Sequence, residues 1–300
     1  MSVYVPEKLK ISEVLSRGVP AVCVEGLEHF DVSQIFDCGQ AFRFLPIDGN
    51  QYHVGGVAYG KYIELLQIGD TLTIINSTVC DYENIWKHYL ALDVDYGEVK
   101  RELSDAMRAQ GDSGVFERAL NVGGGIRLRR QEPWECLCSF IISQNNNIPR
   151  IRKIIGALCE KYGEPIEFDG NTYYSFPSAE TVADAGVDEI FALRTGFRAK
   201  YICDAARAVS SGELDLNKLF EIDTAEAEKA LCHVKGVGPK VAACAMLFSL
   251  EKYDAFPIDV WVKRILEKYY PSGLDITALG RYAGIAQQYL FFYERYTVGR

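Results

Sequence analysis

The stretch from Lys229 to Lys268 reads KALCHVKGVGPKVAACAMLFSLEKYDAFPIDVWVKRILEK, and it predicts two helices joined by a tight turn. Gly236 and Gly238 form the turn, because glycine adopts backbone conformations that other residues avoid. Pro239 suits the first turn of a new helix, since its φ is already helical. Such a turn leaves backbone N–H groups free at the positive end of a helix, where a phosphate of a nucleic acid can bind. Glycines between helices are also ordinary helix caps, so the turn alone leaves both interpretations open.

Two residues in this stretch indicate chemistry. Lys240 lies in the first turn of the apolar helix predicted over 240–250, where the helix dipole and dry surroundings favour the uncharged, nucleophilic amine. Asp259 is predicted to cap the next helix. The first helix carries the chain roughly 16 Å away from Lys240, and the loop 251–258 can span up to about 26 Å. The loop can therefore return Asp259 to Lys240. A solvated lysine and a purely capping aspartate are the alternatives.

Composition limits the class of protein. A chain of 300 residues with 48% hydrophobic content can bury a sizeable core in one large or two modest domains. The net charge of -9 argues against a generally basic coat, so any binding to a nucleic acid must use local positive patches and backbone N–H groups. We expect residues 116–153 to supply such a patch. Its basic residues are Arg118, Arg127, Arg129, Arg130, Arg150, Arg152 and Lys153, against Glu117, Glu132 and Glu135.

The nine cysteines lack regular spacing, which indicates reduced thiols inside a cell more than a disulfide framework. The first residues contain no apolar core of signal-peptide length, and no run approaches the length of a membrane span. We therefore expect a soluble intracellular protein, cytoplasmic if the source is prokaryotic, with no membrane partner.

Two regions follow from the sequence pattern. Residues 1–95 predict an antiparallel β unit, with β-rich runs at 51–59, 62–67 and 71–75 and a hairpin signal at Asp48-Gly49. The first helix is predicted over residues 82–90, and residues 96–300 are predicted to form a succession of amphipathic segments. The predicted class is α+β: an antiparallel sheet domain packed on a mostly helical region, which contains a helix-hairpin-helix at 226–250 and an aspartate loop at 251–260.

Together these features resemble the DNA glycosylase superfamily that is named for its helix-hairpin-helix, Gly/Pro-rich segment and aspartate. Lys240 resembles the bifunctional members, and the match is closest to the 8-oxoguanine DNA glycosylase/AP lyase family over most of the chain. The resemblance implies a curved N-terminal sheet and two helical subdomains with the active site between them. Some members of the superfamily carry an iron-sulfur cluster on four cysteines after the aspartate. Here the last cysteine is Cys244, so no cluster is expected.

The segment 36–44, FDCGQAFRF, resembles the family segment in which a glycine carbonyl accepts a hydrogen bond from N7–H of 8-oxoguanine, and Gly39 matches that glycine. Ordinary guanine has an acceptor at N7, so the carbonyl would meet a lone pair. Composition alone favours a strand that enters the core, and the resemblance is what points to base recognition. The resemblance also implies that Cys244 and Phe291 enclose the extruded base, that Gln287 reads its Watson–Crick edge, and that Pro257 lies in the same pocket.

The residues that match DNA contacts lie in three further segments. Asn145 matches the residue that enters the duplex, and Arg150 matches the arginine that reads the orphaned cytosine, which implies a preference for lesions opposite cytosine. Phe197 matches an aromatic wedge, although tyrosine is expected there, and Arg198 follows it. The remaining predicted contacts are Lys235, Gly236, Gly238 and Trp261, the last standing where the family has a phosphate-contacting histidine.

The resemblance also suggests an ion at the hairpin. Backbone carbonyls of Cys232, Val234 and Val237 match a site for a monovalent or calcium ion that bridges to DNA phosphate. The chemistry itself requires no metal or other cofactor.

The resulting hypothesis is a monomeric base-excision repair enzyme that binds double-stranded DNA containing 8-oxoguanine, preferentially opposite cytosine. Lys240 displaces the base and forms a Schiff base that permits β-elimination, while Asp259 stabilises positive charge on the sugar. Two rivals are a monofunctional glycosylase for alkylated bases, which has no need of Lys240, and a noncatalytic helix-hairpin-helix binding module.

Overall fold

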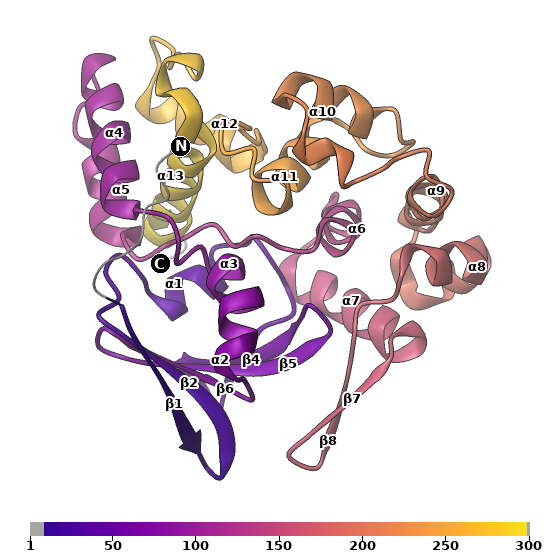
Figure 1. Cartoon of the computed structure of the whole chain (residues 1–300). Coiled ribbons are helices and arrows are strands. Elements are labelled where there is room, and N and C mark those ends of the chain that lie inside the picture. Colours follow the sequence, from indigo (N-terminus) through magenta and orange to yellow (C-terminus); the bar gives the residue numbers. More distant parts are fainter. Residues whose placement is uncertain (1–8, 299–300) are drawn as a thin grey trace.

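The computed structural model describes residues 9–298, and its N-terminal part is a six-stranded antiparallel sheet (Figure 1). The strand order is β1-β2-β6-β5-β4-β3. Leu72 and Ile74 are buried on one face of the sheet, and Tyr62 and Ile75 are buried on the opposite face in a smaller cluster with Phe168. The strands are β1 (Lys10–Ser16), β2 (Val19–Glu25), β3 (Leu45–Ile47), β4 (Asn50–Ala58), β5 (Lys61–Ile68) and β6 (Thr71–Ile75).

The three predicted strands are confirmed as β4, β5 and β6, with ends that differ by at most a residue. Asp48 and Gly49 join β3 to β4 with φ values of 50° and 73°, the left-handed pair typical of a two-residue hairpin. The sequence reasoning missed β1, β2 and the short helix α1 (Val32–Asp37), which Asp31 caps. β1 is an edge strand with mostly exposed side chains, so it lacks an apolar alternation. Residues 1–8 of the predicted domain lie outside the described residues.

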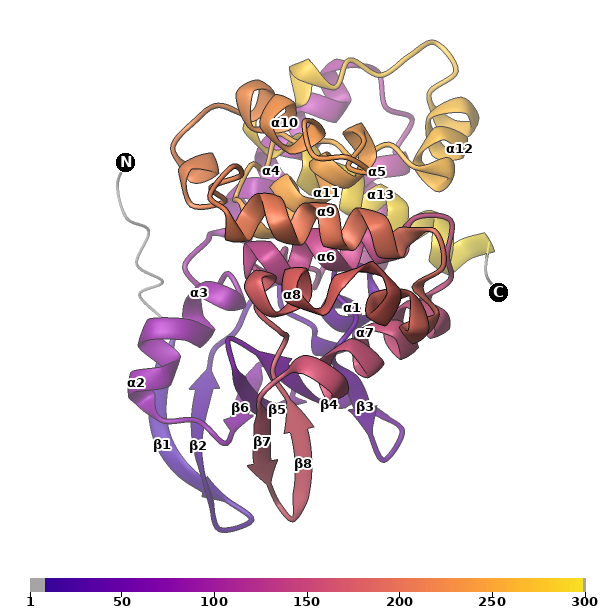
Figure 2. The same ribbon diagram turned by 90° about the vertical axis from the view of Figure 1, so that its right-hand side faces the viewer.

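Helices make up most of the rest of the described chain, and they form two groups (Figures 1 and 2). The first group packs α13 against α5 and α12, with α4 beside α5; the second contains the helices from α6 to α11. The longer helices are α4 (Tyr96–Ala109), α5 (Val115–Gly123), α6 (Pro133–Ser143), α7 (Ile148–Tyr162), α8 (Ala179–Ile190), α9 (Arg198–Ser210), α10 (Thr224–Cys232), α11 (Pro239–Ser249), α12 (Val260–Tyr269) and α13 (Ala283–Val298).

Short helical turns complete the order of elements. The helix predicted over 82–90 is confirmed as a helical segment with a π-helical middle. The turns are α2 (Val79–Asp81), η1 (Tyr82–Trp86), α3 (Lys87–Tyr89), η2 (Phe191–Thr195), η3 (Lys218–Phe220) and η4 (Thr277–Tyr282).

Two buried helices, α6 and α11, form the centre of the helical region and contact each other. Residues 136–142 of α6 and 241–249 of α11 are buried on all sides, which explains their nearly uniform apolar sequence. Helix α11 was predicted over 240–250 from that sequence. Because they are surrounded by other helices, the residues at their ends are held at fixed positions.

A β-hairpin that the sequence reasoning missed connects the two regions. β7 (Pro165–Phe168) and β8 (Asn171–Tyr174) form a hairpin between α7 and α8, and it approaches the sheet (Figure 2). Tyr173 stacks on Tyr62 of β5, with ring centroids 3.7 Å apart. The signal was present in the sequence as Asp169-Gly170, a two-residue turn between β-rich segments.

The hydrophobic cluster beneath the sheet runs from Val22 to Leu92, while the cluster of the helical region draws mainly on residues beyond Ala91. Cys38 and Phe42 of the N-terminal part nevertheless belong to the helical cluster. The domain boundary near residue 95 stays a prediction. All nine cysteines are free thiols. Across residues 9–298, no helix combines the length and the apolar character needed to cross a bilayer.

Candidate active site

The predicted helix-hairpin-helix is formed by α10 and α11. Gly236 has a φ of 90°, and a Cβ on it would lie 2.1 Å from Cγ of Tyr201 in α9. Only glycine fits there, both for the backbone conformation and for the contact. The backbone N–H of Val237 donates to the carbonyl of Val234 at 3.0 Å and closes the turn. Gly238 is the N-cap of α11 and has no capping side chain, so the first N–H groups of this helix are available to an anion.

Lys240 is half-buried in the first turn of α11, and its Nζ lies 5.2 Å from the ring centroid of Phe140 in α6. The same amine lies close enough to the side chain of Cys244, one helical turn further on, to act on its pKa. Burial raises the pKa of the Cys244 thiol to about 11, while the Lys240 charge opposes the rise and the Asp259 carboxylate adds to it. The thiol therefore stays protonated at neutral pH.

Asp259 is the N-cap of α12, as predicted. Its Oδ1 accepts a hydrogen bond from the backbone N–H of Val262 at 2.8 Å, and the side chain is half-buried. This bond fixes the orientation of the carboxylate and leaves its other oxygen available. Because the Asp259 charge acts on the Cys244 thiol, the loop brings the aspartate near α11. Pro257 of the same loop is buried.

The predicted base-reading segment meets α13. Gly39 has a φ of 80°, and a Cβ built on it would lie 3.7 Å from Cε1 of Phe291. Gly39 and Phe291, which are 252 residues apart in the sequence numbering, are thus neighbours. Helix α13 also contacts α11, because Gly284 lies against the side chain of Leu247. One helix therefore connects the segment that carries Gly39 to the helix that carries Lys240.

Gln287 on α13 is buried, with 5% of its surface exposed, and its Oε1 has no hydrogen-bond partner within residues 9–298. A buried amide oxygen without a partner is costly in a folded protein. A ligand with an N–H donor would relieve that cost, as the predicted contact with a Watson–Crick edge requires.

The turn after α6 presents the first group of predicted DNA contacts. Asn145 is exposed and adopts a left-handed φ of 48°. Arg150 is also exposed, in the first turn of α7, and donates to the carbonyl of Arg194 at 3.2 Å. Gln144, which was not predicted as a site residue, donates from its Nε2 to the carbonyl of Gly236 at 3.0 Å. The Asn145 turn and the hairpin are therefore held together.

Phe197 is 56% exposed, in agreement with its interpretation as an exposed aromatic. Arg198 was predicted to contact DNA, but only 2% of its surface is exposed. Its guanidinium donates to the carbonyls of Gln144, Asn145 and Thr195. The sequence pattern did not reveal these three acceptors. Arg198 holds the Asn145 turn in place from inside the protein.

The expected basic patch over residues 116–153 is also corrected by the structure. Arg127, Arg129 and Arg130 are at most 7% exposed. Arg127 donates to backbone carbonyls of the N-terminal region, including that of Ala91 at 2.7 Å, and Arg130 pairs with Asp93 at 2.6 Å. These arginines join the sheet domain to the helices and do not form a surface patch. Of the seven basic residues, Arg118, Arg150 and Lys153 are exposed.

The remaining predicted residues lie on or near the hairpin. Lys235 is exposed, and Trp261 is 36% exposed with the Arg264 guanidinium 5.4 Å from its ring. The carbonyl of Val234 accepts one hydrogen bond within the turn, which leaves one lone pair for an ion. An ion site that also uses Cys232 and Val237 stays a prediction.

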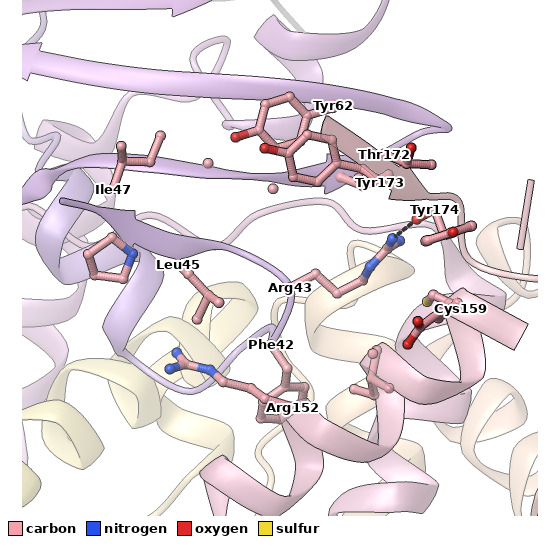
Figure 3. A pocket seen from close by; sticks show the side chains of 17 residues that line it. Phe42, Arg43, Leu45, Ile47, Tyr62, Arg152, Cys159, Thr172, Tyr173 and Tyr174 are labelled. Atoms are coloured by element: carbon pink, nitrogen blue, oxygen red, sulfur yellow. Dashed lines mark hydrogen bonds between the residues drawn. The ribbon is translucent and has the colours of Figure 1, made fainter. Parts of the chain in front are cut away.

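A separate cavity of about 540 Å³ lies between the sheet, α7 and the β7–β8 hairpin (Figure 3). Arg43 crosses it, pairs with Glu135 at 3.0 Å and donates to the carbonyl of Tyr174. None of the predicted site residues lines this cavity.

Two family models match consecutive parts of the chain. The 8-oxoguanine DNA glycosylase N-terminal domain matches residues 24–137, and the HhH-GPD superfamily of base excision DNA repair proteins matches residues 138–278. The first match extends well past residue 95 into the helices. The hairpin, the lysine and the capped aspartate all lie within the second match, so fold and site define a base-excision protein of the HhH-GPD class.

Similar proteins narrow this class. The chain is 41% identical to MBOgg1, whose structure was solved with a low affinity DNA ligand; the match covers 98% of this chain and 100% of that one, with a TM-score of 0.89. It is 36% identical to the 8-oxoguanine glycosylase/lyase of Clostridium acetobutylicum, solved with double-stranded DNA containing cytosine opposite to 8-oxoG, over 96% of this chain and 98% of that one, with a TM-score of 0.87. The chain belongs to the 8-oxoguanine DNA glycosylase family.

A curated relative is the N-glycosylase/DNA lyase OGG1 of Arabidopsis thaliana, 32% identical over 230 residues, which are 70% of this chain and 58% of that protein. The chain spans about half the length of the curated relatives it matches.

Proposed function

We propose that this chain is a bifunctional DNA glycosylase that removes 8-oxoguanine from double-stranded DNA and then cleaves the strand 3′ to the abasic site. The main support is the grouping of Lys240 and Cys244, one turn apart on the buried helix α11, with Asp259, the N-cap of α12, whose charge acts on Cys244. A lysine at the start of a helix, beside a protonated thiol and a fixed carboxylate, has the arrangement of an activated nucleophile. A binding module has no use for this grouping.

In the proposed reaction, the lone pair of the Lys240 Nζ forms a bond to C1′ while the bond from C1′ to the base breaks, and its electron pair leaves with the base. Transfer of a proton from the attached nitrogen to O4′ opens the sugar ring and gives a Schiff base. Transfer of a C2′ proton to water then leaves the electron pair that forms the C2′–C3′ double bond and expels the 3′ phosphate oxygen. The Asp259 carboxylate stabilises the positive charge that develops on the sugar and accepts or orients the lysine proton.

The base is proposed to lie between Cys244 and Phe291, with its edges read by the Gly39 carbonyl and the unpaired Oε1 of Gln287. The preference for a lesion opposite cytosine is part of the proposal and rests on Arg150, whose exposed guanidinium matches the reader of the orphaned base. Duplex DNA is the proposed partner of a monomeric protein, and an ion at the hairpin carbonyls remains an optional part of that contact.

Borohydride trapping tests the nucleophile. Duplexes with 8-oxoguanine opposite each of the four bases are incubated with the protein and reduced, and covalent complexes are separated by electrophoresis. We expect trapping, strongest opposite cytosine, that disappears in Lys240→Gln and persists in Lys229→Gln, an exposed lysine of α10 that is not a predicted DNA contact. Trapping that survives Lys240→Gln would show the nucleophile to be wrong. Base release without trapping would identify a monofunctional enzyme. The absence of both base release and trapping would identify a binding module.

A further inference from the structure

Side-chain amides hold both sides of the turn that carries Gly39. Gln288 of α13 donates to the carbonyl of Cys38 at 2.6 Å, and Gln131 donates to the carbonyl of Gln40 at 2.7 Å. These two glutamines are 2% and 7% exposed. They come from distant parts of the sequence, so the turn is fixed only once the sheet domain and the helices are packed together.

The side chain of Gln40 fixes the same turn from inside the core. Its Oε1 accepts a hydrogen bond from the backbone N–H of Arg129 at 2.8 Å, and its Nε2 donates to the carbonyl of Arg127 at 2.9 Å. Gln40 is fully buried. Movement of this residue would leave several buried polar groups without partners, which is strongly unfavourable.

The carbonyl of Gly39 is left between these fixed groups. The carbonyls of Asp37, Cys38 and Gln40 each accept a side-chain hydrogen bond, whereas the Gly39 carbonyl has no partner within residues 9–298. Glycine has the widest backbone freedom of any residue, so neighbouring contacts must set the direction of its carbonyl. A φ of 80° at Gly39 is one of several conformations that the residue can adopt, and Gln288 restrains the preceding peptide.

We propose that Gln288 is a positioning residue that determines the specificity of the site, an inference that rests on the proposed function. By holding the Cys38 carbonyl, it keeps the Gly39 carbonyl pointing in one direction. A fixed carbonyl accepts a hydrogen bond from the N7–H of 8-oxoguanine and repels the N7 lone pair of guanine. Both effects require that the carbonyl cannot rotate away from the base. A carbonyl that moves freely binds the lesion less well and rejects guanine less strongly.

The variant Gln288→Met tests this inference, because methionine keeps the length and apolar packing of the side chain but removes the donor. Single-turnover rate constants are measured for 8-oxoguanine and for guanine, each opposite cytosine, and for strand cleavage at a preformed abasic site. We expect the rate constant for 8-oxoguanine to fall roughly tenfold, the ratio of 8-oxoguanine to guanine excision to fall with it, and abasic cleavage to stay within about twofold.

Two further variants complete the test. Gln110→Met is the matched control, since Gln110 also bonds to backbone groups, at Asp275, but lies away from the turn; its ratio should equal that of the wild type. Gln131→Met frees the other side of the turn and should lower the ratio as Gln288→Met does. Abasic cleavage reports that each variant is folded. An unchanged ratio in Gln288→Met overturns the inference whatever Gln131→Met does, whereas a wild type that releases no 8-oxoguanine overturns the proposed function instead.

Discussion

A side chain at Gly39 should damage base recognition beyond its cost to stability, and the structure provides a control that separates the two effects. Gly39 and Gly18 have nearly equal φ values, 80° and 79°. Alanine in this left-handed region costs about 1–2 kcal/mol at either position. Gly18 lies in the β1–β2 turn, where a Cβ added to it would meet no atom within 4 Å. Gly18→Ala therefore measures backbone strain alone.

Gly39→Ala adds a methyl group in van der Waals contact with Phe291, 3.7 Å from its Cε1, and this methyl group would occupy space that the proposal assigns to the edge of the extruded base. If the base is kept from the carbonyl, its N7–H is left buried without an acceptor. The expected loss is about 1–3 kcal/mol, or roughly 5- to 150-fold in the rate constant for excision. Lys240 is not displaced, so cleavage of a preformed abasic site should be retained.

The assay compares the wild type and the two alanine variants by thermal unfolding and by single-turnover kinetics on 8-oxoguanine and abasic duplexes. Both variants should unfold at similar temperatures, a few degrees below the wild type. Only Gly39→Ala should lose base excision. Equal losses of excision in Gly39→Ala and Gly18→Ala would refute the reasoning, since the effect would then come from strain and not from the site.

The other predictions concern the hairpin and the thiol. Gly236→Ala should lower the free energy of unfolding by about 2–5 kcal/mol, because residue 236 has a left-handed backbone and the added Cβ would lie 2.1 Å from the Tyr201 ring. Gly238→Ala should lower it by about 1 kcal/mol or less, because the added Cβ would meet no atom within 4 Å. Equal urea midpoints for the two variants would contradict this prediction. Because burial raises the pKa of Cys244 to about 11, its reactive thiolate is scarce at pH 7.5 and increases as the pH approaches 11. Iodoacetamide should therefore label exposed Cys80 first and Cys244 only slowly, and the labelling rate of Cys244 should increase with pH. Peptide mass spectrometry measures the labelling of each cysteine. Equal labelling of Cys80 and Cys244 at pH 7.5 would contradict the burial argument.

Local sequence was sufficient for the elements whose residues determine their own structure. The strand β6 was predicted with its observed ends, and the N-cap role of Asp259 follows from one side chain and the backbone three residues on. The tight turn at Gly236 is likewise a local property. In each case the deciding interactions lie within a few residues of one another, so pattern and spacing carry the information.

Burial of charged residues was not predictable in the same way. Arg127 and Arg130 contribute positive charge to any count along the chain, yet their partners Ala91 and Asp93 lie more than 35 residues away and come close only on folding. Arg198 appeared as a surface contact for the same reason. A charge count cannot separate a solvated arginine from one that pairs with buried carbonyls.

The sequence by itself determined the α+β class, the hairpin, the buried helix after it and the candidate chemistry of Lys240 and Asp259. Only the tertiary structure decided how Gly39 meets Phe291, which residues hold the Gly39 turn, and which arginines face solvent. The physical reason is how far apart in the sequence the interacting residues lie. Helix periodicity, turns and caps arise between neighbours in the chain, whereas a base pocket is assembled from segments that are distant in sequence and meet only when both hydrophobic clusters have packed.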